Sequence, residues 1–286
     1  MKKYLREKVT NLKKTEPIST SNKFWANQSS KLVELILKGD LENFLRWDVI
    51  SETMLFCDKK KALIEKREIS KSPFFKSRYK HLILDPLFGN PKKMSFFEKT
   101  TANTIHHLYH MFRFEKNHFQ IGASKVVLEY GGGYGNFARL INSISSNLVY
   151  IIYDLPVFSH LQHYYLSSCG FNTYDKVDMF PKPGIYCINQ KKDLNFIFEN
   201  LAKNNDEKLF VATWSLSETN IKDRPAIDLL KIFHNHLIAY QDTFEGIENK
   251  NYFEDFKTSL GNVTWVESQI NHLPGNNYLF GYNGNI

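Results

Sequence analysis

The sequence predicts an α/β fold, in which an N-terminal helical cap precedes a Rossmann-like, mostly parallel sheet that ends in an antiparallel hairpin. After Lys125, short apolar runs alternate with segments of helical spacing, a pattern typical of parallel strands joined by helices. Near the C-terminus, two strand-like runs flank Pro274-Gly275-Asn276, which indicates a hairpin. Residues 1–120 show mostly helical spacing instead. We therefore divide the chain into a cap and substrate region over 1–120 and a second domain over 121–286.

The cap is expected to contain helices between irregular segments. Residues 1–22 are polar and are expected to form a loose arm. Helical spacing covers 24–38, and Asp40 is placed to cap a second helix. Residues 70–95 contain several prolines and a glycine, which predicts a segment without regular secondary structure. A further helix, with three histidines, is expected within 99–118.

The second domain is expected to carry strands and helices in alternation. Its predicted strands cover 126–130, 148–153, 185–188, 209–213 and 237–240, and its predicted helices cover 136–144, 157–168, 193–203, 225–234 and 250–258. The hairpin strands are expected over 263–270 and 278–282.

Charge and cysteine content limit the protein's partners and compartment. The formal net charge is +7, which favours anionic partners such as nucleic acid, nucleotide-linked substrates, acidic glycans or an anionic membrane face. The basic clusters at the N-terminus and over 59–67 read more simply as solvated surfaces. Three cysteines without a CxxC motif indicate neither a disulfide framework nor a zinc site. We expect a cytoplasmic protein without a secretory signal or a transmembrane segment. Peripheral membrane contact and oligomeric state stay open.

A glycine-rich turn is the most informative local feature of the sequence. The segment Glu129-Tyr130-Gly131-Gly132-Gly133-Tyr134-Gly135 follows one predicted strand and opens a predicted helix. Glycines at such a turn let a ligand lie against the bare backbone. Asp154 follows the next predicted strand, where an acid can accept hydrogen bonds from both hydroxyls of a ribose. The pattern predicts an adenosine-containing ligand.

Two cofactor classes compete for this turn. Gly133-x-Gly135-x-x-Ala138 also matches the dinucleotide fingerprint, with Asp154 at a suitable distance. Glu129 decides between them, because a carboxylate would repel a pyrophosphate but would attract the ammonium and sulfonium groups of S-adenosylmethionine. We therefore predict S-adenosylmethionine, with dinucleotide binding and a structural or inactive site as the alternatives.

The motif Glu-x-Gly-Gly-Gly-x-Gly with Tyr-Asp-Leu-Pro over 153–156 resembles class I S-adenosylmethionine-dependent methyltransferases. Across 95–282 the chain is similar to bacterial putative sugar O-methyltransferases. This wider similarity rests on Gln162-x-Tyr164-Tyr165-Leu166 and on the segments 214–218, 249–253 and 272–278. It implies the class I methyltransferase sheet and methylation of a sugar hydroxyl on a glycan or nucleotide-sugar precursor, as in surface polysaccharide biosynthesis.

The resemblance also implies cofactor contacts at matching positions. Glu129, Tyr130 and the backbone from Gly131 through Gly132 and Gly133 to Gly135 would hold the methionine part, Asp154 the ribose and Leu155 the adenine. Asn189 is favoured for a second adenine contact because of its spacing to the next strand, and 178–180 is the rival segment. Ser215 completes the predicted cofactor contacts.

Candidates for the catalytic base follow from the need to remove a proton from a sugar hydroxyl. Glu218 lies just beyond the strand 209–213, at the edge where ligands bind in open α/β sheets. His106 and His110 share one face of their predicted helix, and His272 precedes the hairpin turn. No metal is expected, since Glu218 and Asp242 alone would leave a ligand set incomplete.

Other functions remain as alternatives. A nucleic-acid methyltransferase would suit the positive charge, but the segment after the strand 209–213 has hydroxyl groups in place of the proline-rich turn that grips a flipped base. We therefore expect a sugar or glycoconjugate partner and no nucleic acid. An O-methyltransferase of another small metabolite is the nearest enzymatic alternative, and a cofactor-binding scaffold is the non-enzymatic one.

Overall fold

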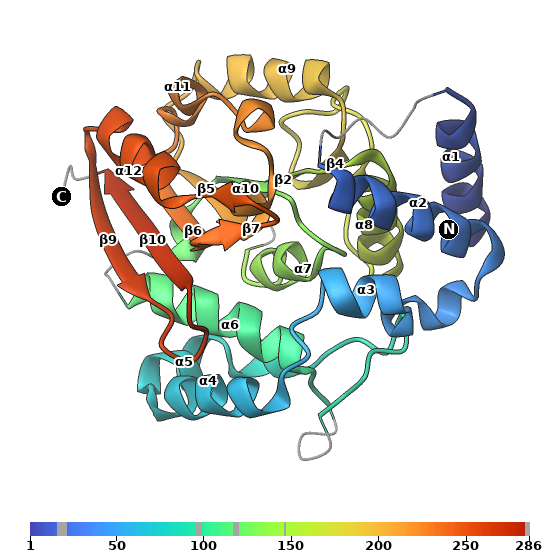
Figure 1. Cartoon of the computed structure of the whole chain (residues 1–286), viewed down its shortest axis with the longest axis horizontal. Helices are drawn as coiled ribbons and strands as arrows, with labels where there is room; N and C mark the ends of the chain where they lie inside the picture. The colour runs from blue at the N-terminus through green and yellow to red at the C-terminus, as the bar shows by residue number, and fades with distance from the viewer. Residues whose placement is uncertain (16–21, 95–98, 117–119, 146, 284–286) are drawn as a thin grey trace.

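The computed structural model of the chain describes residues 1–15, 22–94, 99–116, 120–145 and 147–283. Its centre is an eight-stranded sheet with the order β3-β4-β2-β1-β5-β6-β10-β9, and helices lie on both of its sides (Figure 1). The strands are β1 (Val126–Tyr130), β2 (Val149–Tyr153), β3 (Thr173–Tyr174), β4 (Gly184–Ile188), β5 (Lys208–Thr213), β6 (Asn235–Gln241), β9 (Val263–Gln269) and β10 (Asn276–Asn283).

The direction of the strands confirms the predicted fold class. β1 pairs in parallel with β2 and with β5, and β6 continues the parallel run beside β5. β10 is antiparallel both to β6 and to β9, so the C-terminal hairpin closes one edge of the sheet. The chain therefore has a mostly parallel, Rossmann-like sheet with a terminal antiparallel pair.

Side chains that alternate along the strands divide the interior into two cores. On β1, Val127 belongs to the core that also contains the cap helices, α7 (Asn136–Asn142) and α8 (Pro156–Ser168). Val126 and Leu128 face the opposite core, which contains α9 (Lys191–Leu201), α11 (Ile227–Leu230) and α12 (Lys250–Ser259). Burial on both faces explains why the central strands read as continuous apolar runs.

The helices of the cap pack on one face of the sheet. They are α1 (Lys2–Thr15), α2 (Lys23–Lys38), η1 (Leu41–Arg46), α3 (Asp48–Thr53), α4 (Lys59–Lys71), α5 (Pro73–Arg78), η2 (Lys80–Ile83) and α6 (Ala102–Glu115). Asp40 caps η1 as expected, by accepting from the backbone N–H of Glu42. The division of the chain at residue 120 stays a prediction.

Two expectations for the cap are wrong. Residues 2–15 form a helix where a loose arm was expected, because Leu5 and Val9 share one face and are fully buried against the rest of the protein; residues 16–21 of that expected arm lie outside the described residues. Within 70–95, Pro73 starts a helix because a proline at the first helical position needs no N–H partner.

The second domain differs from expectation mainly after β5. The helix predicted over 225–234 is reduced to the four residues Ile227–Leu230. Short elements that the apolar pattern did not indicate are α10 (Ser215–Glu218), η3 (Ile121–Ala123), η4 (Ile221–Asp223), β3 and the small hairpin of β7 (Thr243–Phe244) and β8 (Ile247–Glu248). In the described part of the chain, no helix combines the length and the apolar character that crossing a membrane requires.

Candidate cofactor and acceptor site

A cavity of about 1160 Å³ opens at the carboxyl ends of the parallel strands. Its floor comes from the residues that follow β1, β2, β4 and β5, and the cap contributes the 52–56 segment and the start of α6. This is the edge at which ligands bind in open α/β sheets. Of the predicted site residues, those that line it are Glu129, Tyr130, Gly131, Gly132, Gly133, Asp154, Leu155, Asn189, Ser215, Glu218 and His106.

The glycine turn needs glycine because of its backbone and its neighbours. Gly131 has φ 74°, and a Cβ there would lie only 2.4 Å from Cβ of Ser215. The Ser215 hydroxyl donates to the carbonyl oxygen of Tyr130 and thereby joins the turn to the segment after β5. Gly135, with φ 97°, caps α7 and does not line the cavity. Ser215 and Gly135 thus shape the turn.

Glu129 carries a buried carboxyl group beside this turn. It is 1% exposed and accepts one hydrogen bond from the Tyr150 hydroxyl at 2.8 Å. A Cβ on Gly132 would lie 3.1 Å from Oε2 of Glu129, so the carboxyl group sits directly against the turn. Burial raises the pKa of Glu129 to about 8. No ion pair to Glu129 occurs among the described residues, so a cationic group from a ligand would meet an uncompensated acid.

Asp154 follows β2 and holds the turn from its other side. Its carboxylate accepts hydrogen bonds from the backbone N–H of Gly132 at 2.9 Å and of Leu155 at 2.7 Å, and from the Gln162 amide at 2.7 Å. Burial raises the pKa of Asp154 to about 6, while these hydrogen bonds oppose the rise. Oδ2 accepts two of these hydrogen bonds, whereas Oδ1 accepts only that of Leu155 and keeps a lone pair for a ligand hydroxyl.

The far end of the cavity lies between the segments after β2 and β4. Asn189 and Gln190 line it, whereas no residue of the rival segment 178–180 does. The rings of Tyr130 and Tyr153 lie 5.9 Å apart in the same lining. This geometry favours Asn189 over the rival, and its role as an adenine contact stays a prediction.

Glu218 lines the cavity at the end of α10, close to the cap. It accepts a hydrogen bond from the Gln241 amide at 3.2 Å, and burial raises its pKa to about 7. Asp242 is absent from the lining and instead contacts Lys250 and Asn277. The pair Glu218 and Asp242 therefore does not meet in the cavity.

The three predicted histidines gather around a glutamate that the sequence analysis missed. His106 lines the cavity, and its Nδ1 lies 2.6 Å from Oε1 of Glu65. His272 does not line the cavity, but its Nε2 lies 2.7 Å from the same oxygen. His110 is buried behind His106, with its Nδ1 2.6 Å from the Tyr278 hydroxyl. The structure thus brings these histidines together but places only His106 at the cavity.

A signal for Glu65 was present in the sequence. Ala62, Glu65 and Ile69 have the spacing of one helix face, and all three are buried in α4. A carboxylate on an apolar helical face calls for a buried partner. Because the segment 59–67 is rich in lysine, it was interpreted as a solvated surface, and the buried face with Glu65 was not predicted.

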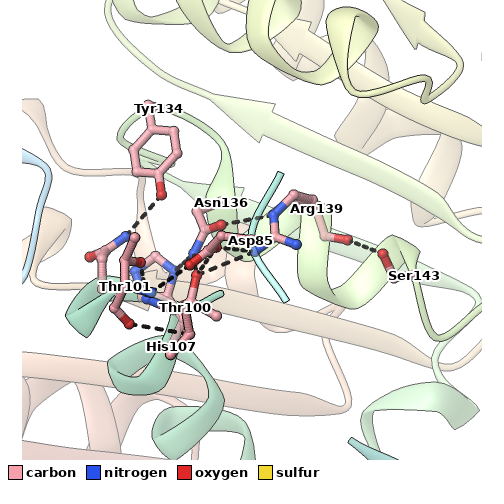
Figure 2. Close-up of polar contacts among 10 residues, drawn as sticks. Asp85, Thr100, Thr101, His107, Tyr134, Asn136, Arg139 and Ser143 are labelled. Atoms are coloured by element: carbon pink, nitrogen blue, oxygen red, sulfur yellow. Dashed lines mark hydrogen bonds and ion pairs between the residues drawn. The ribbon is translucent and has the colours of Figure 1, made fainter. Parts of the chain in front are cut away.

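A polar network fixes the histidine-bearing helix to the glycine turn (Figure 2). Arg139 of α7 lies 3.0 Å from Asp85 of the cap and donates to the Asn136 side chain at 2.9 Å. Asp85 also accepts from the backbone N–H of Thr101, which caps α6. The Asn136 amide lies 3.1 Å from Nδ1 of His107, and burial lowers the pKa of His107 to about 3. The network therefore holds α6 in register with the helix that follows the turn.

Comparison with known proteins gives similarity only at the level of solved structures. No family model and no curated protein matches the chain. An O-methyltransferase family protein from Burkholderia thailandensis is similar with 11% identity, over 99% of this chain and 94% of that chain, at a TM-score of 0.39. The fibrillarin pre-rRNA processing protein of Methanococcus jannaschii shares 15% identity over 58% and 70%, at 0.38. The 16S rRNA methylase ArmA shares 18% over 59% and 79%, at 0.36. Because these similarities are weak, we argue the function from the site itself.

Proposed function

We propose that this protein is an S-adenosylmethionine-dependent O-methyltransferase that acts on a sugar hydroxyl of a glycan or nucleotide-sugar precursor. One observation carries the proposal: the buried carboxyl group of Glu129 lies against a glycine turn and has no cationic partner among the described residues. A dinucleotide would bring a doubly negative pyrophosphate to this group, whereas the methionine part of S-adenosylmethionine brings an ammonium.

The residues around the cavity fit the rest of that cofactor. Asp154 would accept the ribose hydroxyls, and Leu155 and Asn189 would border the adenine. Tyr130 and the glycine turn would hold the methionine part. When bound, the cofactor supplies a methyl group on a sulfonium, which an aligned nucleophile can take.

The cap side of the cavity offers aromatic surface to a sugar acceptor. This part of the lining contains the rings of Trp25 and Phe56. The side-chain amides of Asn22 and Asn103 border it as well, but their hydrogen bonds are made within the protein. None of the described cap residues in the lining is a lysine or arginine. Aromatic rings suit the apolar faces of sugars. The cationic side chains of the lining, Lys191, Lys222 and Arg224, all lie outside the cap.

The compartment follows from the same proposal. Cys57, Cys169 and Cys187 are all free, which fits a reducing cytoplasm. There the protein would modify a precursor before its assembly into a surface polysaccharide.

Calorimetric titration tests the cofactor class. We expect S-adenosylhomocysteine to bind and NAD not to bind in the same buffer. Asp154→Ala should weaken binding at least about tenfold, through loss of a charge-assisted hydrogen bond. Asp242→Ala is the matched control, because this acid follows β6 and lies outside the lining. Binding of NAD alone would refute the proposal.

Transfer of a labelled methyl group tests the acceptor. The panel contains neutral glycosides, nucleotide-sugars, a catechol and total RNA. Labelling of a sugar would support the proposal in full, while labelling of the catechol or of RNA alone would replace the sugar by that acceptor class. Cofactor binding without transfer to any member would favour a scaffold.

A further inference from the structure

The imidazole ring of His106 is clamped on three sides. Phe56 stacks on one face, with ring centroids 3.9 Å apart and planes at 12°. Trp214 lies against the ring at 5.2 Å and 23°. Oε1 of Glu65 lies 2.6 Å from Nδ1 and so occupies one edge of the ring. These contacts leave the ring little freedom to rotate or to flip.

Trp214, which forms part of this clamp, has an unfavourable backbone conformation. Its φ is 65°, which is unusual for a bulky side chain. Its indole N–H donates to Oδ1 of Asn276 at 2.6 Å, which ties the ring to the C-terminal hairpin. Strained residues of this kind concentrate at functional sites.

The remaining edge of His106 carries Nε2. Although the residue is only 2% exposed, it belongs to the cavity lining. No hydrogen-bond partner for Nε2 occurs among the described residues, whereas Nδ1 has Glu65. The one ring atom left for a ligand is therefore Nε2.

Glu65 is oriented from two elements at once. Its Oε1 lies 2.6 Å from His106 on α6 and 2.7 Å from His272. His272 lies on the loop between β9 and β10, which extends to the cap (Figure 1) and there also contacts Tyr109 of α6. The carboxyl group of Glu65 is fully buried. An ionised carboxylate can only accept hydrogen bonds, so Nδ1 of His106 and Nε2 of His272 must each donate to it. A carboxylate at Nδ1 places the proton of neutral His106 on that nitrogen and leaves a lone pair on Nε2.

We propose that Glu65 positions His106 as the catalytic base of the methyl transfer, with Nε2 of His106 taking the proton of the acceptor hydroxyl. This inference rests on the proposed function. The proton moves to Nε2, the electron pair of the acceptor oxygen forms the bond to the methyl carbon, and the pair of the broken carbon–sulfur bond stays on sulfur. The imidazolium that results lies beside the Glu65 carboxylate, which balances its charge.

The clamped orientation of His106 suits this role better than the looser placement of Glu218. Burial lowers the pKa of His106 well below its usual value, so its lone pair is free at neutral pH. Burial raises the pKa of Glu218 to about 7, so its carboxyl group is only partly ionised under the same conditions. Glu218 also lacks an orienting contact other than the Gln241 amide among the described side chains.

The tautomer of His106 provides a test that needs no acceptor. We would label the protein with ¹⁵N-histidine, record long-range ¹H–¹⁵N spectra at pH 7.5, and assign His106 by its loss in His106→Gln. We expect the wild-type ring to be protonated at Nδ1 and Glu65→Gln to shift the ring nitrogens toward a mixture of tautomers. Glu68→Gln is the matched control, because this exposed residue of the same helix contacts Tyr109 and not His106.

Either of two spectra would overturn the proposal. A wild-type His106 protonated at Nε2 could not accept the proton, and this result does not depend on whether any variant folds. An unchanged tautomer in Glu65→Gln would remove Glu65 from the positioning role.

A second measurement separates this inference from the proposed function. We expect Glu65→Gln and His106→Gln to bind S-adenosylhomocysteine as wild type does, and to lower kcat at least about 100-fold with little change in KM for any acceptor that the panel identifies. A kcat in His106→Gln equal to that of the wild type would refute the inference. The proposed function would still stand in that case, as long as the wild type binds S-adenosylhomocysteine. Failure of the wild type to bind S-adenosylhomocysteine would instead refute the proposed function.

Discussion

Cofactor binding should be linked to the ionisation of Glu129. Its pKa is raised to about 8 by burial, so about nine in ten molecules carry a neutral carboxyl group at pH 7. An ammonium group beside this carboxyl favours the ionised form and must displace the proton. The displacement costs about 1.4 kcal/mol at pH 7 and almost nothing above pH 9.

The sign and size of the pH effect follow from this pKa. Affinity for a cationic ligand should rise with pH, because only the ionised carboxylate attracts it. Between pH 6.5 and 8 the ionised fraction of Glu129 grows about 15-fold, and the dissociation constant should fall by the same factor. Asp154, with a pKa of about 6, adds less than about twofold over this range.

Calorimetry with S-adenosylhomocysteine measures both the affinity and the protons released. Titrations at pH 7 in buffers of different ionisation enthalpy should give about 0.9 proton released per ligand bound. Glu129→Gln should bind more weakly and lose the pH dependence, while Glu199→Gln, an exposed acid on α9, should behave as wild type. A constant affinity from pH 6.5 to 8 without proton release would refute the assignment of Glu129 to the amino group.

Two substitutions test the scaffold around the site. Asp85→Ala leaves the buried Arg139 without its carboxylate partner at 3.0 Å, so the free energy of unfolding in urea should fall by about 3–5 kcal/mol; a loss below about 1 kcal/mol would mean that the network contributes little. Gly131→Ala places a Cβ 2.4 Å from Cβ of Ser215, and affinity for S-adenosylhomocysteine should fall at least about tenfold. Adding Ser215→Gly should restore part of that affinity by removing the clash, and no rescue at all would assign the loss to the backbone conformation alone.

Local features of the site could be predicted because they depend on residues close together in the chain. The apolar run of β1, the glycine turn and the start of α7 form one continuous segment, and Asp154 follows the next buried strand. Strand length, turn chemistry and parallel pairing then bring Glu129 and Asp154 to the same edge of the sheet. The hairpin at Gly275 was predicted for the same reason.

The cap was harder to predict because its short elements are stabilised by distant parts of the chain. In α1, Leu5 and Val9 are two apolar positions among lysines, and only the surface that they bury makes the helix stable. The expected helix over 225–234 shrank to four residues, since tertiary packing overrides weak helical spacing.

The sequence by itself determined the sheet, the glycine turn and the acids beside it, because each is encoded within a few neighbouring residues. Which of the two histidines His106 and His110 lines the cavity was decided only by the tertiary structure. The HHxxH spacing puts His106 and His110 on one helix face, but the packing of α6 leaves His106 at the cavity and buries His110 behind it. Glu65 meets His106 and His272 only because α4, α6 and the C-terminal hairpin converge. Contacts between segments so far apart in the chain depend on how the elements pack, and no local pattern specifies that packing.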